Sequence, residues 1–151
     1  MTVRRPAAAK AGREPAAVDP VARLMVDVPL PHLDRPFDYL VPTTLDAEVQ
    51  LGSRVRVRFA GRLVDAYVLE RRAATDHEGG LVYVERAVGS EPVLTPETIA
   101  LFRAIADRWA GNFVDVVRLG VPARHAAAET AARAGGRVPR HASVDRPAAG
   151  R

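Results

Sequence analysis

The segment Gly52–Phe59 ends in the run Arg-Val-Arg-Val-Arg-Phe, in which basic and apolar residues alternate. Successive side chains of a β-strand point to opposite faces, and this alternation therefore predicts a strand with one buried and one wet face. The tripeptide Ala60-Gly61-Arg62 follows directly and is typical of a tight turn. The apolar residues of 63–72 then predict the strand that returns from this turn.

Three more strand-like segments surround this pair of strands. They cover residues 21–28, 37–41 and 81–88, and three prolines in residues 29–36 mark a loop between the first two. The sequence therefore predicts four or five short strands, with no internal repeat.

The last part of the predicted domain is helical. Thr95 is a good N-cap, Pro96 suits the first helical position, and Glu97 complements the helix dipole. Apolar residues then recur every three to four positions, and Gly111 is suited to end the helix. A second short helix is expected over residues 113–119. The fold class is α+β: a small β-rich curled sheet or barrel followed by one or two C-terminal helices.

The two ends of the chain differ from its middle. Residues 1–20 and 123–151 lack apolar periodicity, and we expect a disordered leader and an Ala/Arg/Gly-rich linker or disordered tail. Residues 21–122, with twelve arginines and fourteen acidic residues, have a net charge of −2, whereas the whole chain has +4. The positive charge lies in the ends and says little about what the predicted domain 21–122 binds.

Several classes of function are excluded by what the sequence lacks. It has no cysteine, no phosphate-binding Gly-x-x-x-x-Gly-Lys-Ser/Thr loop and no Gly-x-Ser-x-Gly nucleophile turn. Its histidines lie far apart and are expected to be solvated surface residues: His32, His77, His125 and His141. We therefore expect a binding module with no catalytic residue, metal or cofactor. No apolar run approaches the ~20 residues of a membrane span, so a cytoplasmic protein without a membrane partner is expected.

The basic face of the predicted strand is the first candidate for binding. Arg54, Arg56 and Arg58 repeat about every 7 Å along the strand, with Arg62 across the turn. Such a row matches the repeat of a nucleic-acid backbone and is one way to hold a single strand. Equally, alternate exposed arginines can pair with acidic residues of the neighbouring strand, such as Asp65.

The second candidate is the run Arg35-Pro36-Phe37-Asp38-Tyr39, which follows the proline-rich loop. Two aromatic residues around an aspartate can stack a base and hydrogen-bond its polar edge. In the alternative interpretation, Phe37 and Tyr39 are the inward residues of a strand and Asp38 caps a turn.

Four motifs, in the same order along the chain, resemble the N-terminal part of the proteins of one bacterial family. They are Val26-Asp27-Val28-Pro29-Leu30-Pro31 with Arg35 to Pro42, Gly52 to Phe59, Ser90-Glu91-Pro92-Val93-Leu94-Thr95, and Arg108-Trp109-Ala110 with Asp115-Val116 and Leu119 to Pro122. The family is that of primosomal protein N′, the replication-restart factor PriA. The resemblance covers about residues 21–125.

The resemblance implies a β-rich module that holds the 3′ end of the nascent leading strand at a stalled replication fork. It implies a pocket that senses the free 3′-hydroxyl without strong base preference. The implied partners are DNA 3′ ends and fork structures, other primosome proteins or single-stranded DNA-binding proteins, and the implied location is the nucleoid. The family's helicase core and zinc-binding cysteines have no counterpart in this sequence, so the chain itself is expected not to be an enzyme.

The family's pocket residues map onto this chain only in part. Its Phe-Asp pair corresponds to Phe37 and Asp38, and its glycine corresponds to Ala60 or, with a shift of one residue, to Gly61. Its lysine falls near Val82, where this chain has no lysine. Two other hypotheses stay open: a protein–protein module that docks through the arginine face, and a truncated remnant of a longer helicase.

Overall fold

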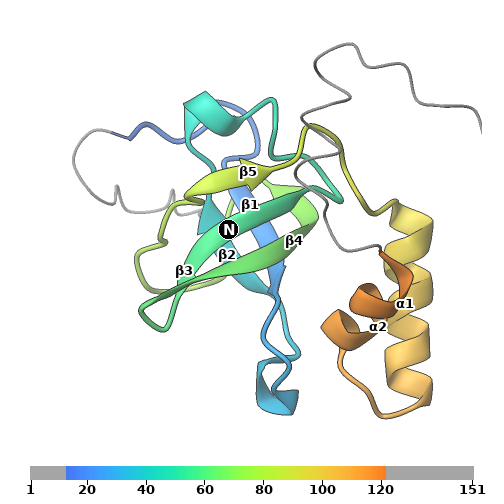
Figure 1. Ribbon diagram of the computed structural model, residues 1–151. Helices are drawn as coiled ribbons and strands as arrows, with labels where there is room; N and C mark the ends of the chain where they lie inside the picture. Colours follow the sequence, from blue (N-terminus) through green and yellow to red (C-terminus); the bar gives the residue numbers. More distant parts are fainter. Residues whose placement is uncertain (1–12, 122–151) are drawn as a thin grey trace, which may run out of the picture.

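The computed structural model of this protein describes residues 13–121, which form one antiparallel sheet followed by two helices (Figure 1). The sheet has five strands in the order β2-β1-β4-β3-β5. The elements are β1 (Val21–Val26), β2 (Phe37–Leu40), β3 (Arg54–Phe59), β4 (Arg62–Arg72), β5 (Arg86–Val88), α1 (Pro96–Arg108) and α2 (Phe113–Gly120), with short 3-10 turns η1 (Pro31–Leu33) and η2 (Thr43–Leu45). The predicted α+β fold is confirmed as a curled sheet that does not close into a barrel. The predicted disorder of residues 1–12 and of the C-terminal tail lies outside the described residues.

The concave face of the sheet holds the main core. Val55 and Val57 of β3 are fully buried, while the arginines between them lie on the opposite face, as the alternation predicts. The apolar side chains that meet them from the other strands and loops are Ala16, Ala22, Leu24, Val26, Tyr39, Val41, Val49, Ala66, Val68 and Val84. Burial of these side chains supplies the main driving force for curling the sheet.

The two helices cover part of the outer face. They lie side by side along one flank of the sheet (Figure 1). Met25 of β1 and Tyr67 of β4 pack into a second apolar cluster with Phe102, Phe113 and other helix residues. The helices are therefore anchored by apolar burial on the two central strands.

The start of α1 follows the prediction, and its end differs by one residue. The side chains of Thr95 and Thr98 form a reciprocal capping box with the backbone of the first turn. At the other end Ala110 takes the left-handed conformation, with φ of 52°, and the Gly111 N–H donates to the Ala106 carbonyl. The predicted glycine cap thus takes part in the helix end, but an alanine occupies the left-handed position.

Asp34, in the connection between β1 and β2, also holds the two helices. Asp34 Oδ1 accepts a hydrogen bond of 3.0 Å from the Phe113 N–H, the first residue of α2. Its Oδ2 lies 3.0 Å from Arg103 Nη1 of α1. Asp34 therefore caps α2 in place of the usual N-cap side chain, because Asn112 makes no capping bond.

The predicted strand 81–88 is split between two partners. The Leu40 N–H donates to the Val82 carbonyl and the Val84 N–H to the Leu40 carbonyl, which ties this segment to β2. After Glu85 the chain changes partner, and only Arg86–Val88 pairs with β3. One segment therefore contacts β2 at one side of the sheet and β3 near the other, which favours the curl of the sheet.

The predicted leader is wrong for residues 13–20, which the structure places against the sheet. The Ala16 N–H donates to the Val41 carbonyl at 2.8 Å, and the Thr43 N–H donates to the Glu14 carbonyl at 2.9 Å. Ala16 is buried in the main core. The sequence did not show this because the segment adds backbone hydrogen bonds and one small side chain, neither of which makes an apolar pattern.

Arg71 of β4 also holds the segment of residues 13–20. Its guanidinium donates to the carbonyls of Val18, Asp19 and Val49, and forms an ion pair of 2.7 Å with Asp46. The side chain is 11% exposed, so these bonds are largely shielded from water. The planar fork of arginine suits three separate carbonyls and a carboxylate, and it ties residues 18–19 to the loop before β3.

Gly52 marks the closest approach of two backbone segments. Its φ is +82°, and its carbonyl accepts hydrogen bonds from the N–H groups of Val93 and Leu94. A Cβ at this position would lie 1.8 Å from the Leu94 carbonyl oxygen. A side chain is therefore excluded by conformation and by space at the point where the chain leaves the sheet for α1.

We predict that Gly52→Ala lowers the free energy of unfolding by about 2 kcal/mol or more, because the strained backbone and the overlap with Leu94 add together. Chemical denaturation followed by tryptophan fluorescence measures this. Gly111→Ala is the matched control, since a Cβ there meets no atom within 4 Å. Equal stability of the two variants would contradict the prediction.

Candidate nucleic-acid interface

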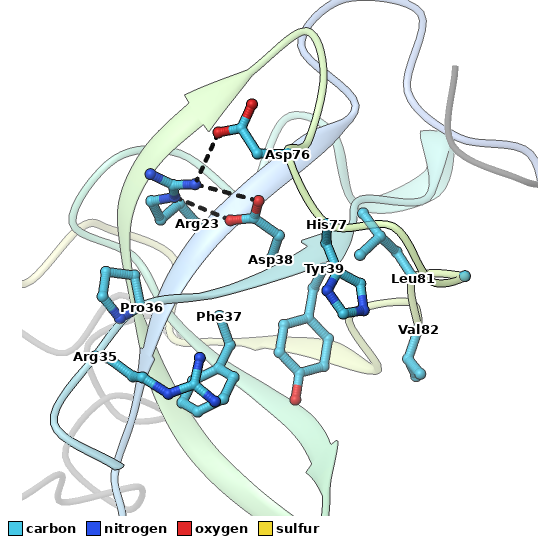
Figure 2. Close-up of a pocket in the computed structure, with 11 residues that line it drawn as sticks. Arg23, Arg35, Pro36, Phe37, Asp38, Tyr39, Asp76, His77, Leu81 and Val82 are labelled. Atoms are coloured by element: carbon cyan, nitrogen blue, oxygen red, sulfur yellow. Dashed lines mark hydrogen bonds and ion pairs between the residues drawn. The ribbon is translucent and has the colours of Figure 1, made fainter. Parts of the chain in front are cut away.

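A cavity of about 390 Å³ lies beside β2 (Figure 2). Its walls come from β1, from the start of β2 and from the loop between β4 and β5. The lining residues are Arg23, Arg35, Pro36, Phe37, Asp38, Tyr39, Asp76, His77, Gly80, Leu81 and Val82. The structure thus brings the Phe37-Asp38-Tyr39 motif, named from the sequence, to one concave site.

Asp38 is held in place by two donors. It faces Arg23 across the β1–β2 pair, and Arg23 Nε donates to Asp38 Oδ1 at 3.0 Å. Thr75 Oγ1 donates to Asp38 Oδ2 at 2.7 Å. The Asp38 side chain is only 7% exposed, so the carboxylate is largely buried but paired. Burial alone would raise the pKa of Asp38, and the hydrogen bonds from Arg23 and Thr75 outweigh it, so that this pKa lies below its usual range.

The same contacts fix one wall of the cavity. Thr75 Oγ1, which donates to Asp38, also accepts a hydrogen bond from the His77 N–H. Asp76 Oδ2 lies 3.9 Å from Arg23 Nη2 and 3.4 Å from Arg72 Nη1. The loop that carries Asp76 and His77 is therefore tied to β1 and β2 through side chains, with Asp38 at the centre.

The two aromatic residues of the motif have different surroundings. Phe37 is half-buried; its ring meets the Phe59 ring edge-on at 5.0 Å, and the Arg35 guanidinium lies 4.4 Å from its centroid. Tyr39 is buried in the main core, and its hydroxyl donates to the Arg58 carbonyl at 3.0 Å. Burial raises the pKa of Tyr39 to about 12. Tyr39 is thus an inward strand residue, as the alternative interpretation had it.

The turn residues carried over from the resemblance lie apart from the cavity lining. Ala60 and Gly61 form a two-residue hairpin loop between the paired residues Phe59 and Arg62, with φ of 47° and 79°. Both positions are in the left-handed region that glycine or asparagine adopts most readily. Val82, near which the resemblance expects a lysine, is 50% exposed and does line the cavity.

The arginine row is largely engaged within the fold. The Arg54 guanidinium lies 5.5 Å from the Tyr67 ring centroid. Arg56 pairs with Asp65 at 2.7 Å, and Arg58 lies 3.6 Å from Glu85. The expected alternative of pairing with the neighbouring strand therefore holds for Arg56.

Arg62 completes the predicted row and lies exposed at the start of β4. Within residues 13–121, it forms no ion pair. It pairs with Phe59 across the hairpin, so its side chain belongs to the face opposite to that of Arg56 and Arg58. The structure therefore does not place the four arginines on a single face.

Sequence reasoning missed Arg23, Thr75 and Asp76 as parts of the site. Arg23 sits in an otherwise apolar strand, which was the one available signal. His77 is exposed, as expected, but it lies on the cavity wall. Among the residues the structure describes, no group of three His, Asp or Glu side chains gathers as a metal site, and no helix is long and apolar enough to span a membrane.

The part of the chain that matches known proteins coincides with the sheet and the two helices. Residues 23–122 match the family model described as the 3′ DNA-binding domain (3′BD) of PriA. The probable replication restart protein PriA of Mycobacterium tuberculosis is 58% identical over 100 residues, which are 66% of this chain and 15% of that protein. The Mycobacterium leprae protein of the same name is 54% identical over 100 residues, with the same coverage. The replication restart protein PriA of Bacillus subtilis is 33% identical over 103 residues, which are 68% of this chain and 13% of that protein.

The state of Asp38 gives a testable pH dependence. Because its pKa is lower in the folded than in the unfolded chain, it contributes stability above its usual pKa, and this is lost as the pH falls below about 4. Asp38→Asn should lower the free energy of unfolding at pH 7 by about 1–3 kcal/mol. It should also flatten the loss of stability between about pH 5 and pH 3.

Urea denaturation across this pH range measures both effects. Thr75→Val, which removes one donor to Asp38, should give an intermediate pH profile. A pH profile of Asp38→Asn as steep as that of the unsubstituted chain would contradict the assignment.

Proposed function

The chain belongs to the family of the PriA 3′ DNA-binding domain, and from this premise we propose that its cavity holds the 3′-terminal nucleotide of a DNA strand. The observation that carries the proposal is the buried, ionised Asp38 at the centre of a concave site that also contains Phe37. The natural substrate we propose is the nascent leading strand at a stalled fork.

Asp38 suits recognition of a hydroxyl end. Arg23 and Thr75 keep the carboxylate ionised and oriented, and a carboxylate oxygen can accept more than one hydrogen bond. A terminal 3′-hydroxyl can therefore donate to it. A 3′-phosphate offers extra negative charge instead, which the carboxylate repels. An internal nucleotide has no such hydroxyl.

The size of the cavity supports recognition of an end rather than a long tract. Its volume of about 390 Å³ falls within the range of about 300–1,000 Å³ that is usual for small-ligand pockets. Arg56 and Arg58, which would follow a strand along the sheet, lie near Asp65 and Glu85. These ion pairs also weaken the case for a protein partner docked on that face.

The proposed role is binding without catalysis. The chain spans about 15% of the length of the curated relatives that it matches. We propose DNA binding for this share and assign no helicase activity to it. Action at replication forks implies a location at the nucleoid. Other primosome proteins and single-stranded DNA-binding proteins are the partners that such a role suggests.

We expect the unsubstituted chain to bind a single-stranded oligonucleotide with a free 3′-hydroxyl more tightly than the same oligonucleotide with a 3′-phosphate. Fluorescence anisotropy with a 5′ label measures both affinities. Asp38→Ala should abolish the difference, because the acceptor for the hydroxyl is lost.

Circular dichroism must show that Asp38→Ala remains folded. Thr75→Val is the matched control for the hydrogen-bond network, since it keeps the carboxylate and should keep a preference for the hydroxyl end. Equal binding of the two ends by the unsubstituted chain would refute the proposed function.

Salt dependence separates end recognition from tracking of the backbone by the arginine face. Each phosphate contact on a single strand contributes about −0.7 to the slope of log affinity against log salt concentration. Replacing Arg56 and Arg58 together by glutamine would therefore change the slope by about 1.4 if both contacted phosphates. We expect no such change. A slope reduced by that amount, with hydroxyl preference unaffected by Asp38→Ala, would favour binding of the strand along the arginine row.

A further inference from the structure

Arg35 lines the cavity and stacks on the ring of Phe37, two residues further along the chain. Its guanidinium lies 4.4 Å from the centroid of the Phe37 ring, a distance typical of a cation stacked on an aromatic face. Phe37 is itself supported edge-on by Phe59. Pro36 lies between the two stacked residues and has a restricted backbone. Figure 2 shows the Arg35 side chain lying across the Phe37 ring, and both residues line the cavity.

This stacking changes what Phe37 can offer a ligand. The guanidinium lies over one face of the ring and Phe59 meets the ring edge-on. A nucleotide that enters the cavity from this side therefore meets Arg35 first. The planar guanidinium keeps its N–H donors directed outward from its edges, where they can bind two oxygens at once.

The charges of the lining residues also single out Arg35. Arg23 is paired with Asp38 and lies close to Asp76. Within the part of the chain that the structure describes, Arg35 forms no ion pair with an acidic side chain. The lining has two arginines, Arg23 and Arg35, and two carboxylates, so its formal charges sum to zero. Without Arg35 the lining would carry a net negative charge and would repel a phosphodiester.

We propose that Arg35, stacked on Phe37, is the residue of this cavity that binds the phosphate of the 3′-terminal nucleotide. The proposal rests on the proposed function, because it assigns a ligand contact within the same site. It also accounts for the valine at position 82, where the resemblance expects a lysine: the cation reaches the cavity from the opposite side, through the residue two before Phe37.

The test compares three variants of the complete chain with a 5′-labelled oligonucleotide that has a free 3′-hydroxyl. Arg35→Gln should weaken binding by about tenfold or more, because a charge-assisted hydrogen bond to phosphate is lost. The salt slope should become shallower by about 0.7. Arg35→Lys keeps the charge and should keep the salt slope. Arg35 is exposed, so none of these changes removes a buried contact.

Arg108→Gln is the matched control. Arg108 is likewise an arginine beside an aromatic ring, with its guanidinium 5.5 Å from the Trp109 centroid, but it lies on α1 and does not line the cavity. It should bind as the unsubstituted chain does. Equal effects of Arg35→Gln and Arg108→Gln would overturn the proposal. Equal weakening by Arg35→Gln and Arg35→Lys, with an unchanged salt slope, would also overturn it, because it would indicate base stacking.

The preference for a 3′-hydroxyl over a 3′-phosphate is measured first with the unsubstituted chain. Its absence would overturn the proposed function and with it the role of Arg35. Its presence, together with an Arg35→Gln variant that binds normally, would overturn the role of Arg35 alone.

Discussion

Burial of β1 on both faces is the constraint on which the rest of the structure depends. Its inward residues Ala22, Leu24 and Val26 fill the concave core, and on the outer face Val21 and Met25 are covered by two separate apolar clusters. Arg23 is the one residue of this strand that is not buried, and it lies between the two covers. Its guanidinium needs a counter-charge at that place, and Asp38 of the edge strand supplies it. The cavity therefore lies between the two apolar clusters that cover the outer face of β1, next to the edge strand β2.

The sequence predicted the elements better than it predicted their meeting points. Alternation in Arg54–Phe59 and the capping residues Thr95 and Pro96 are local signals, and the structure confirms the strand and the helix start. The partnership of Arg23, Asp38 and Thr75 depends on strand register and on the path of a long loop, neither of which is encoded within a few residues. The motif around Asp38 lies in the lining of the cavity, while the partners that hold the Asp38 carboxylate came only with the structure.

The arginine row shows how a pattern can be read correctly and still leave function open. The period of two placed Arg54, Arg56 and Arg58 on one face, as the sheet has them. Register then set Asp65 opposite Arg56, which pairs the charge inside the fold. Residues 13–20 illustrate the opposite case: they have no pattern, yet backbone hydrogen bonds and the fork of Arg71 hold them. Periodicity reports apolar burial, so it does not register segments that are fixed by polar contacts.

The capping role of Asp34 has a mechanical consequence. Asp34 holds the first turn of α2 and also Arg103 of α1, while the next residue, Arg35, reaches into the cavity. Two adjacent residues thus connect the helix pair to the cavity lining through a single peptide bond. The backbone that carries Arg35 is therefore continuous with the backbone that anchors both helices, so the positions of the helix pair and of the Arg35 backbone are set together.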